Sequence, residues 1–283
     1  TISYTEGEIT KTDTTLIDVI ALALVSIEVT GSVSGDIYEG DTTIDLTGLT
    51  VTKTYNSGAT ASVSLEDVST DIATVASVSG LGKTLTLSYT EEEITKTTTI
   101  AIDVLELVLT EIAIEGSLEN IIYEGDTTID LTGLTITATY NSSATKELLY
   151  GEVTTNNIQT LAATPGEDKT LTISYLEKGV TKTDSILVDV VEVVVSSISA
   201  TGSVIHTVYE GDTTIDLIGV AITKTYNNGT TGTVALVDIT TDISSVSVEP
   251  GIEKILTLTY EEELIEVSTT IRINVVEVVM TSF

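Results

Sequence analysis

The amino-acid sequence predicts an all-β protein built as a linear array of tandem β-sandwiches. Three observations predict it. A twelve-residue segment, YEGDTTIDLTGL at residues 38–49, recurs unchanged at 123–134 and as YEGDTTIDLIGV at 209–220. Apolar residues alternate with threonine and other polar residues over short stretches. No window has apolar residues at helical spacing over three turns.

The recurring dodecamer defines the unit of the array. Its copies begin 85 and 86 residues apart. A second block agrees, because LTLSYTEEEITKTTTIAIDV at 85–104 is similar to 171–190, more loosely to 256–275, and also to residues 2–19. A period near 85 residues is too long for a solenoid repeat and has the size of a small independent domain. The dodecamer is therefore one part of a domain copied in tandem.

Short strands follow from the alternation. In LTVTKTY (49–55) and LTLSY (85–89), apolar residues recur with a period of two, interrupted in the first by Lys53, so one face of each strand is expected to be buried. Turn residues separate the strands, as in Asn56-Ser57-Gly58, Pro165-Gly166 and the acidic tip at 91–93. About seven short strands in each 85 residues indicate a β-sandwich.

The order of the repeated motifs is similar to that of a known family. Tyr-Glu-Gly-Asp, Asp-Leu-x-Gly-Leu, Tyr-Asn-x-Gly and Leu-Thr-x-Ser-Tyr resemble the bacterial immunoglobulin-like domains of cell-surface proteins, over essentially the whole chain. The resemblance implies tandem immunoglobulin-like sandwiches of extracellular stalks, adhesins, surface-layer-associated proteins and some phage particles. It implies no catalytic residues. The third copy departs at 266–268 and at Asn274, where the others have Thr-Lys-Thr and aspartate.

Four segments result from the period. We expect residues 1–24 to be a partial repeat, the last two strands of a sandwich. Three immunoglobulin-like sandwiches should follow: repeat 1 at 25–108, repeat 2 at 109–194 and repeat 3 at 195–280. Apolar residues continue through the seams without glycine-rich or proline-rich linkers, which predicts short, stiff junctions.

The partial repeat carries apolar residues that are core positions elsewhere, namely Tyr4, Ile9, Ile17 and Val19. Left alone, a hairpin of this kind would expose an apolar face and two strand edges. Two arrangements would complete it, upstream sequence or strands from a neighbouring copy.

The tyrosines follow the same period, which predicts that they pack in the cores. Three positions recur, and only Tyr150 lies outside them: Tyr38, Tyr123 and Tyr209; Tyr55, Tyr140 and Tyr226; Tyr4, Tyr89, Tyr175 and Tyr260. We expect Tyr89 to be largely buried, with its hydroxyl hydrogen-bonded near the sandwich edge as in a tyrosine corner. Other expected core residues are Leu46, Leu131 and Leu217; Val51, Ile136 and Ile222; Leu87, Ile173 and Leu258; Ile102, Val188 and Ile273.

Charge and composition exclude several partners. The formal net charge is −32, from 43 acidic and 11 basic residues, so nucleic acid and anionic membrane surfaces are not expected partners. The bland interpretation of this acidic composition is solubility, and the sharper one is binding of divalent cations. Cysteine is absent, so disulfides and thiol chemistry are excluded. No apolar run is long enough for a membrane helix, so we expect no membrane insertion in this segment.

The sequence predicts no enzyme and no cofactor. His206 is the one histidine and lies in a loop, where it is expected to face solvent. Without cysteine or a second histidine, the usual nucleophile–base pairs cannot be assembled. A two-carboxylate glycosidase would need aromatic platforms, and aromatic residues are 4% of the chain, with no tryptophan.

The repeated acidic turn is the candidate calcium site. Asp41, with Asp45 nearby, recurs as Asp126 and Asp212, and calcium takes six to eight oxygen ligands. The spacing of an EF-hand is absent. We therefore expect Gly40 to form a turn, Asp45 to cap a strand, and no metal to bind.

Three further features are candidate sites. Lys53 and Lys224 have the apolar parity of their strands, so a lysine–asparagine cross-link is conceivable, although Ala138 stands there in repeat 2. The sequons at Asn141 and Asn228 lie in hairpin turns and are weak glycan acceptors. The most divergent segment of repeat 2 runs from 146 to 161 and includes Tyr150 and Asn156-Asn157, which makes it the best location for any local binding specificity.

The leading functional hypothesis is a structural stalk or fibre segment of an extracellular cell-surface protein, able to assemble into a filament. Its partners would be other copies or domains of the same surface assembly. An alternative is an adhesin-type binding module for a glycan or protein. A third hypothesis is a phage tail or capsid decoration domain.

Overall fold

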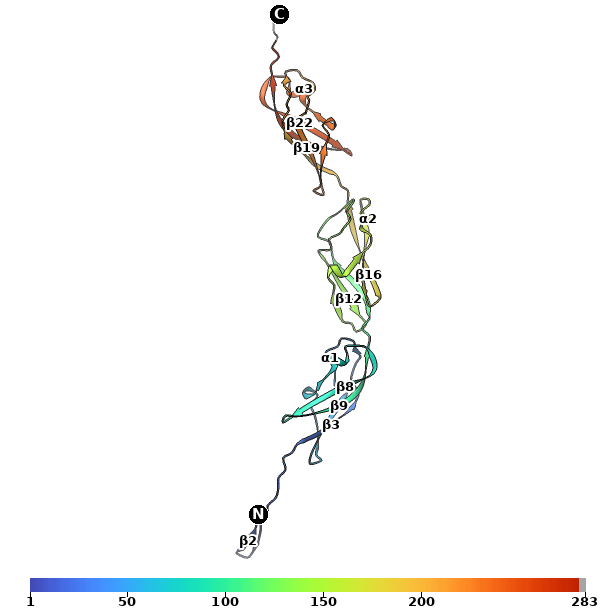
Figure 1. Ribbon diagram of the computed structural model, residues 1–283, viewed down its shortest axis with the longest axis vertical. Helices are drawn as coiled ribbons and strands as arrows, with labels where there is room; N and C mark the ends of the chain where they lie inside the picture. The colour runs from blue at the N-terminus through green and yellow to red at the C-terminus, as the bar shows by residue number, and fades with distance from the viewer. Residues whose placement is uncertain (280–283) are drawn as a thin grey trace. The chain divides into compact units, whose positions relative to one another are not determined.

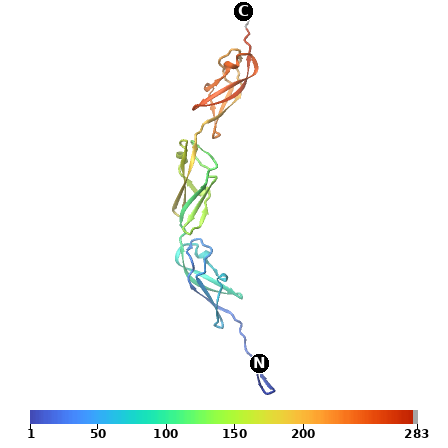
Figure 2. The same cartoon turned by 180° about the vertical axis from the view of Figure 1, so that it is seen from behind.

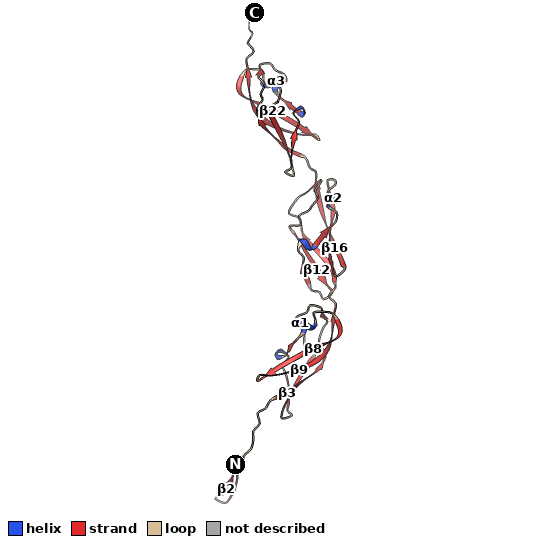
Figure 3. Cartoon of the chain, in the orientation of Figure 1, coloured by secondary structure: helices blue, strands red, loops and turns tan. Residues whose placement is uncertain are grey.

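The computed structural model describes residues 1–279, and the chain is an all-β protein of tandem sandwiches, as predicted. Strands form most of each repeat, and the helices are single turns (Figures 1 and 3). The contacts divide the chain into two units. Unit 1 comprises Thr1–Glu111, Ala138–Lys146 and Glu177–Lys182, and unit 2 comprises the other described residues. Repeat 1 thus belongs to unit 1 and repeat 3 to unit 2, while residue 280, the predicted end of repeat 3, lies outside the described residues.

Repeat 1 has seven strands in two sheets. Its elements are β3 (Leu24–Gly31), β4 (Ile37–Tyr38), β5 (Leu49–Tyr55), β6 (Thr60–Ser62), η1 (Leu65–Asp67), β7 (Ser69–Thr70), α1 (Ile72–Val75), β8 (Gly80–Glu91) and β9 (Ile94–Leu105). One sheet has the order β3-β5-β6 and the other β4-β9-β8-β7. All pairs are antiparallel except β4 with β9, where Ile37 lies opposite Val104 in a parallel pair.

Repeats 2 and 3 copy this topology. Repeat 2 contains β10 (Leu109–Gly116), β11 (Ile122–Tyr123), β12 (Leu134–Tyr140), β13 (Thr145–Glu147), η2 (Tyr150–Glu152), β14 (Val153–Thr155), α2 (Ile158–Leu161), β15 (Gly166–Glu177) and β16 (Val180–Val191). Repeat 3 contains β17 (Val195–Gly202), β18 (Val208–Tyr209), β19 (Val220–Tyr226), β20 (Thr231–Val234), η3 (Leu236–Asp238), β21 (Ile239–Thr241), α3 (Ile243–Val246), β22 (Gly251–Glu262) and β23 (Ile265–Val276). The sheet orders are β10-β12-β13 with β11-β16-β15-β14, and β17-β19-β20 with β18-β23-β22-β21. The expected seven strands per repeat are confirmed.

The long hairpin β8–β9 shows why the alternating sequence forms this sandwich. Leu85 and Leu87 are fully buried, whereas Thr86 and Ser88 between and beside them are partly exposed. Successive strand residues point to opposite faces, so the predicted alternation becomes one apolar and one polar face. At the tip, Glu92 and Glu93 have φ of 46° and 69°, which matches the primed turns that suit the twist of a hairpin.

The glycine near the end of the dodecamer is required by a close approach of two backbones. A Cβ on Gly48 would lie 2.0 Å from the carbonyl oxygen of Ser32. A Cβ on Gly31 would lie 2.3 Å from the carbonyl oxygen of Gly48, and Gly31 has a φ of +98°. The pairs Gly116 with Gly133 and Gly202 with Gly219 repeat this geometry, with the corresponding distances at 2.1–2.4 Å. The backbone at the end of β3 and the backbone just before β5 therefore approach so closely that only glycine fits at both positions.

The predicted core residues lie inside the repeats. All are buried except Leu46, which is partly buried and packs against the core of repeat 1. Leu87, Ile173 and Leu258 are each completely inaccessible to solvent. Burying one such side chain contributes roughly 1.5–3 kcal/mol, so these equivalent positions are major sources of stability in every repeat.

The tyrosines are only partly core residues, which corrects the prediction. Tyr175 and Tyr260 are buried and Tyr89 is partly buried, but Tyr209 is 47% exposed. Tyr209 and its equivalents end the short strand at the beginning of each dodecamer, at the sandwich edge. Periodic recurrence does not separate core positions from edge positions, because both are copied with the domain.

The partner of Tyr89 also differs from the prediction. Its hydroxyl accepts a hydrogen bond from Lys53 Nζ at 3.1 Å, so its recorded partner is a side chain and not the backbone of a tyrosine corner. The partly exposed Lys53 is the donor to this hydroxyl at the sandwich edge. The ring therefore belongs to a polar cluster at the strand ends.

The partial repeat forms the predicted hairpin. β1 (Ile2–Glu6) pairs antiparallel with β2 (Ile9–Asp13), and Ile2 lies opposite Asp13. Residues 14–23 then run without secondary structure to β3 (Figure 2). Every residue of the two strands is exposed.

None of the helices formed by residues 1–279 is long and apolar enough to cross a membrane.

Candidate functional site at the repeat junctions

Each repeat begins with a linker that one asparagine holds in place. In repeat 2, Asn141 Oδ1 accepts a hydrogen bond from the Val108 N–H at 3.0 Å, and Asn141 Nδ2 donates to the Glu106 carbonyl at 3.0 Å. The backbone N–H of Asn141 also donates to the Val108 carbonyl at 3.0 Å. Asparagine suits this position because its amide both donates and accepts, whereas an ionised aspartate only accepts.

The same clamp occurs at every linker. Asn56 makes its three hydrogen bonds to Ala21 and Ala23, at 2.9–3.2 Å. Asn227 makes its three to Glu192 and Val194, at 2.8–3.1 Å. The sequence predicts only a turn at these asparagines, because their partners lie 33 and 35 residues away in the chain.

A tyrosine from the preceding repeat contacts the same asparagine. Within unit 1, the Tyr38 hydroxyl donates to the Asn141 carbonyl at 3.4 Å. Within unit 2, the Tyr123 hydroxyl donates to the Asn227 carbonyl at 3.1 Å. The first residue of the dodecamer therefore links repeats, which is why its ring is not in a core.

One junction also carries an ion pair. Lys178 Nζ lies 2.9 Å from Glu39 Oε2 within unit 1, and the hydrogen bond to Glu39 raises the pKa of this lysine. The residues at the equivalent positions one repeat later are Glu263 and Glu124, which have the same charge. Because Lys178 is about half exposed, the pair contributes little to stability but makes the two junctions chemically different.

A lysine cluster closes the strand ends of repeat 1. Lys53 Nζ donates to Glu91 Oε1 at 2.9 Å and lies 5.4 Å from the ring centre of Tyr55 and 5.3 Å from that of Tyr89. The Tyr55 hydroxyl donates to Glu91 at 3.0 Å. Hydrogen bonding to Tyr55, then to Glu91 and Tyr89, raises the pKa of Lys53, and the bond from Lys53 lowers the pKa of Glu91.

Repeat 3 has the same cluster, with Lys224 Nζ 2.6 Å from Glu262 Oε1 and 3.2 Å from the Tyr260 hydroxyl. Its pKa is raised, first by the bond to Glu262. The recorded hydrogen bonds of both lysines go to carboxylate and phenol oxygens. Within residues 1–279, neither amine has an asparagine amide among its hydrogen-bond partners, which gives the lysine–asparagine cross-link no support. In repeat 2 the equivalent residue, Ala138, is fully buried.

A second repeated lysine has a structural role that the sequence did not predict. Lys83 Nζ donates to the Val75 carbonyl at 2.8 Å and to the Val78 carbonyl, at the end of α1. Lys169 and Lys254 do the same at the ends of α2 and α3, at 2.9 and 2.8 Å from the carbonyls of Leu161 and Val246. A cation at a helix C-terminus satisfies carbonyls without an intrahelical partner. Its recurrence at the repeat period is the signal that could have revealed it.

The acidic turns hold backbone groups. Asp41 accepts a hydrogen bond from the Tyr38 N–H at 2.8 Å, and Asp126 and Asp212 do the same in their repeats at 2.8 Å. Asp45 accepts from the Thr47 N–H at 2.9 Å, a bond that lowers the pKa of Asp45. Among residues 1–279, no three acidic or histidine side chains gather as a metal site. That calcium is not bound stays a prediction.

The other predicted candidates are used within the fold or lie at the surface. The Tyr150 hydroxyl donates to the Leu134 carbonyl at 2.7 Å. The Asn156 side chain bonds to Thr170 and Thr172, and the Asn157 side chain caps α2 through the Thr160 N–H.

His206 lies 3.0 Å from Asp216 at an exposed position, so it faces solvent as expected. Asn228 accepts hydrogen bonds from the backbone and hydroxyl of Thr230. Asn141, the other sequon residue, donates from its amide nitrogen to the Glu106 carbonyl, so the atom that a glycan would occupy already serves the linker.

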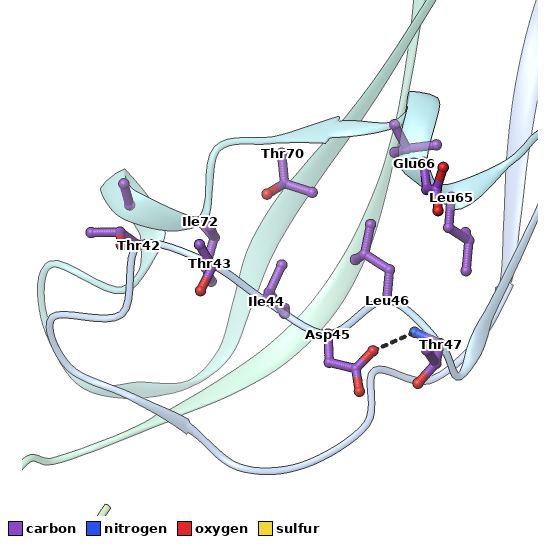
Figure 4. A pocket seen from close by; sticks show the side chains of 12 residues that line it. Thr42, Thr43, Ile44, Asp45, Leu46, Thr47, Leu65, Glu66, Thr70 and Ile72 are labelled. Carbon is purple, nitrogen blue, oxygen red and sulfur yellow. Dashed lines mark hydrogen bonds between the residues drawn. The ribbon is translucent and has the colours of Figure 1, made fainter. Parts of the chain in front are cut away.

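An open groove of about 440 Å³ in repeat 1 lies between residues 42–47 of the dodecamer and residues 65–73 (Figure 4). Ile44, Leu46, Leu65 and Ile72 provide its apolar lining. The Asp45 carboxylate at its edge is directed to the Thr47 N–H, as the dashed line in Figure 4 shows. The groove has no set of converging charged groups, so it offers shape and apolar surface but little chemical specificity.

Comparisons with known proteins give weak likenesses. No family model matches the chain, and no curated protein matches it. Among solved structures, it is similar to domains 4–9 of the surface layer protein SbsC, with 16% identity and a TM-score of 0.25 over 90% of this chain. It spans about half, 48%, of that structure. The full ectodomain of mouse nectin-like molecule 4 (Ig1–Ig3) gives 10% identity and a TM-score of 0.21, over 91% of this chain and 97% of that one. Similarity at this level assigns the chain to neither protein.

Proposed function

We propose that the chain is a structural stalk or fibre segment of an extracellular surface protein. The observation that carries this proposal is the repeated linker clamp. Asn56, Asn141 and Asn227 each hold a linker through three hydrogen bonds, and Tyr38 and Tyr123 bond to two of these asparagines. A spacer needs fixed linkers, because a free joint lets the distance between its ends collapse.

The use of the repeated polar residues supports the same function. The turn aspartates hold the backbone, and the helix-end lysines hold carbonyls. A binding module would instead be expected to leave polar side chains available at one surface site. The charge of −32 favours mutual repulsion and solubility, which suits an array exposed to water.

The experiment measures the freedom of the junction between repeats 1 and 2. The chain has no native cysteine, so spin labels can be placed at Thr99→Cys and Thr183→Cys, both exposed. We expect Asn141→Ala to broaden the distribution of distances between the labels, because it frees the linker at Glu106 and Val108. Ser142→Ala is the matched control, since its hydroxyl accepts a bond from Ala144 in the same turn and does not touch the linker.

Equal distance distributions in the original chain, the Asn141→Ala variant and the control would mean that the clamp does not restrain the junction. The stalk function would then lose the observation that carries it. Hydrogen exchange of β12 in each variant would verify that repeat 2 remains folded.

A further inference from the structure

A groove in repeat 3 gathers polar residues that the other repeats do not have. It has a volume of about 400 Å³ and lies between residues 203–208 and the end of β23. A groove of about 390 Å³ lies at the equivalent place in repeat 2, between residues 116–122 and the end of β16. The parallel strand pairs define the equivalence, Val208 with Val275 in repeat 3 and Ile122 with Val190 in repeat 2. The two grooves can therefore be compared residue by residue.

Four differences give the groove of repeat 3 hydrogen-bond donors. With the residue of repeat 2 first, the pairs are Asn120 and His206, Ile121 and Thr207, Leu187 and Arg272, and Asp189 and Asn274. Arg272 and His206 are the only arginine and the only histidine of the chain. With histidine counted as neutral, the formal charge of the four positions changes from −1 in repeat 2 to +1 in repeat 3. In a chain of net charge −32, this local change favours an anionic ligand.

The fold leaves most of these donors available. Arg272 Nη1 lies 3.3 Å from Glu253 Oε2, and the two side chains are 65% and 63% exposed, so this ion pair is weak. Asn274 Oδ1 accepts a hydrogen bond from the Glu253 N–H at 2.9 Å, and its Nδ2 group has no partner within residues 1–279. His206 Nδ1 lies 3.0 Å from Asp216 Oδ2, which leaves Nε2 for a ligand. A guanidinium, an amide and an imidazole can thus donate to one bound group.

The charges around the groove favour a single carboxylate over a phosphate. Glu253 lines the groove and Asp216 holds His206, so a dianion would meet two carboxylates and one permanent cation. A planar carboxylate can accept two parallel hydrogen bonds from a guanidinium. The volume is within the range of about 300–1,000 Å³ that small-molecule sites occupy. At physiological ionic strength, charges more than about 8 Å away are largely screened, so the groove's own groups decide the binding.

We propose that this groove binds the carboxylate group of a small ligand, with Arg272 as its main contact and Asn274 and His206 as further donors. Sugar acids and acidic amino-acid side chains both offer this group. Repeats 1 and 2 lack the site, because neither has a cation at the position of Arg272. The site is a local addition to one repeat and is independent of the stalk function, since the asparagines that hold the linkers are not part of it.

The test is an NMR titration of the full chain at constant ionic strength. The probes are glucuronate and the α-amide of N-acetylglutamate, and their uncharged counterparts are glucose and the α-amide of N-acetylglutamine. We expect the two carboxylates to cause saturable shifts in the signals of Arg272, Asn274 and His206, and the uncharged compounds to cause none. Arg272→Leu should weaken binding by at least about 10-fold, because it removes a charged hydrogen-bond donor. Asn274→Asp should also weaken binding, because it returns a carboxylate to the groove.

The variants are chosen so that repeat 3 keeps its fold. Arg272→Leu and Asn274→Asp each introduce the residue that repeat 2 has at the same position. Lys11→Leu, which removes an exposed cation elsewhere, is the control for net charge and should leave binding unchanged. The reverse variant, Leu187→Arg with Asp189→Asn, should create a second site in repeat 2. The signals of the buried Leu256 and Leu258 report that repeat 3 remains folded.

The absence of saturable shifts with both carboxylates, or equal binding in the Arg272→Leu variant, would overturn the proposal. Equal shifts with glucose and glucuronate would also overturn it, because the carboxylate would then not be what the groove recognises. Binding of glucuronate alone would support the proposal and assign the groove to sugar acids. Binding of the glutamate derivative alone would support it and assign the groove to acidic side chains.

Discussion

Repeats 1 and 3 carry a lysine at a strand position where repeat 2 has none. Repeats 1 and 3 have Lys53 and Lys224 on the inward face of β5 and β19, and repeat 2 has the buried Ala138 on β12. The tyrosines and the glutamate around the lysine are nevertheless kept, as Tyr140, Tyr175 and Glu177. Repeat 2 therefore keeps the surrounding residue types although this strand position carries no lysine.

The register shows where repeat 2 places a lysine. In repeat 1, Lys53 lies opposite Ala61, and in repeat 3, Lys224 lies opposite Gly232. The backbone bonds from Tyr140 to Ala144 and from Leu148 to Ile136 set the register of β12 and β13, and Ala138 then lies opposite Lys146. Directly opposed residues share one face of a sheet. Repeat 2 therefore carries a lysine on the neighbouring strand, directly opposite the position that Lys53 and Lys224 occupy in the other repeats.

The largest expected effect is on the tyrosine shared by the clusters. Tyr175→Ala in repeat 2 should cost about 3–5 kcal/mol, because the ring is buried and its removal leaves a cavity. Tyr89→Ala in repeat 1 should cost less, because part of that ring is already exposed. Hydrogen exchange of the slowest amides in β15 and β8 measures each loss within the intact chain.

Leu87→Ala and Ile173→Ala are the matched controls for this comparison. Both side chains are completely buried, so both changes should cost about 2–5 kcal/mol, without a systematic difference between the repeats. Equal losses for the two tyrosines would mean that the environments of the clusters do not differ in energy.

The next effect tests the exchange of the lysine. Ala138→Lys should destabilise repeat 2, because it crowds a closed site and adds a second ammonium group beside Lys146. Adding Lys146→Ala recreates the arrangement of repeat 1 and should recover part of the loss. We expect a coupling free energy of about 0.5–3 kcal/mol between the two positions in a double-mutant cycle.

Additive effects of Ala138→Lys and Lys146→Ala on the stability of repeat 2 would contradict the idea that the two positions are alternative places for one lysine. The control for side-chain size is Ala138→Met, which brings a long apolar chain without charge. If Ala138→Met is rescued by Lys146→Ala as well as Ala138→Lys is, the coupling reflects space and not charge.

Much of this fold could be predicted because the information is local and repeated. The alternation around Leu87 and the turn at Asn56-Ser57-Gly58 each depend on adjacent residues. The clamp made by Asn56 depends on partners 33 and 35 residues earlier in the chain, and no local sequence pattern predicts these partners. The recurrence of Tyr38 predicts a core residue, but its hydroxyl contacts the next repeat. The sequence does not separate these cases, because a junction contact recurs at the same period as a core contact. That Lys146 of repeat 2 lies opposite the position equivalent to Lys53 can be recognised only when the register of the strands is known.

Acid should weaken repeat 1 through Glu91. The bond from Lys53 holds the folded pKa of Glu91 below its usual 4.5, so the stabilisation is present above pH 4.5 and is lost as the pH falls through the folded pKa. The raised pKa of Lys53 acts at the other end, where stabilisation is complete below pH 10.5 and is lost at higher pH. Lys53→Met should remove the contribution of this pair to the acid-induced loss in repeat 1 and leave repeat 3 unchanged.

Hydrogen exchange or melting at several pH values between 3 and 6 compares the original chain with the Lys53→Met variant. The difference between the two chains isolates the pair from the many other carboxylates, which titrate equally in both. An unchanged pH dependence of repeat 1 in the variant would show that Lys53 does not set the titration of Glu91.

The smallest expected effect is that of calcium. Asp41, Asp126 and Asp212 already accept backbone hydrogen bonds, and no three ligand-type side chains gather among the described residues. Ligand binding stabilises a protein by RT ln(1 + [L]/Kd), so millimolar calcium without a tight site should shift the melting temperature by less than about 2 °C relative to chelator. Ionic strength must be matched with a monovalent salt, because 43 acidic residues against 11 basic ones make the chain sensitive to screening. The three copies of the turn are alike. Calcium bound at each turn would therefore raise the melting temperature of all three repeats together, which would obscure the difference in stability between repeat 2 and repeats 1 and 3. A rise above about 10 °C would reverse this prediction, and Asp41→Asn, Asp126→Asn and Asp212→Asn would then be the first variants to examine.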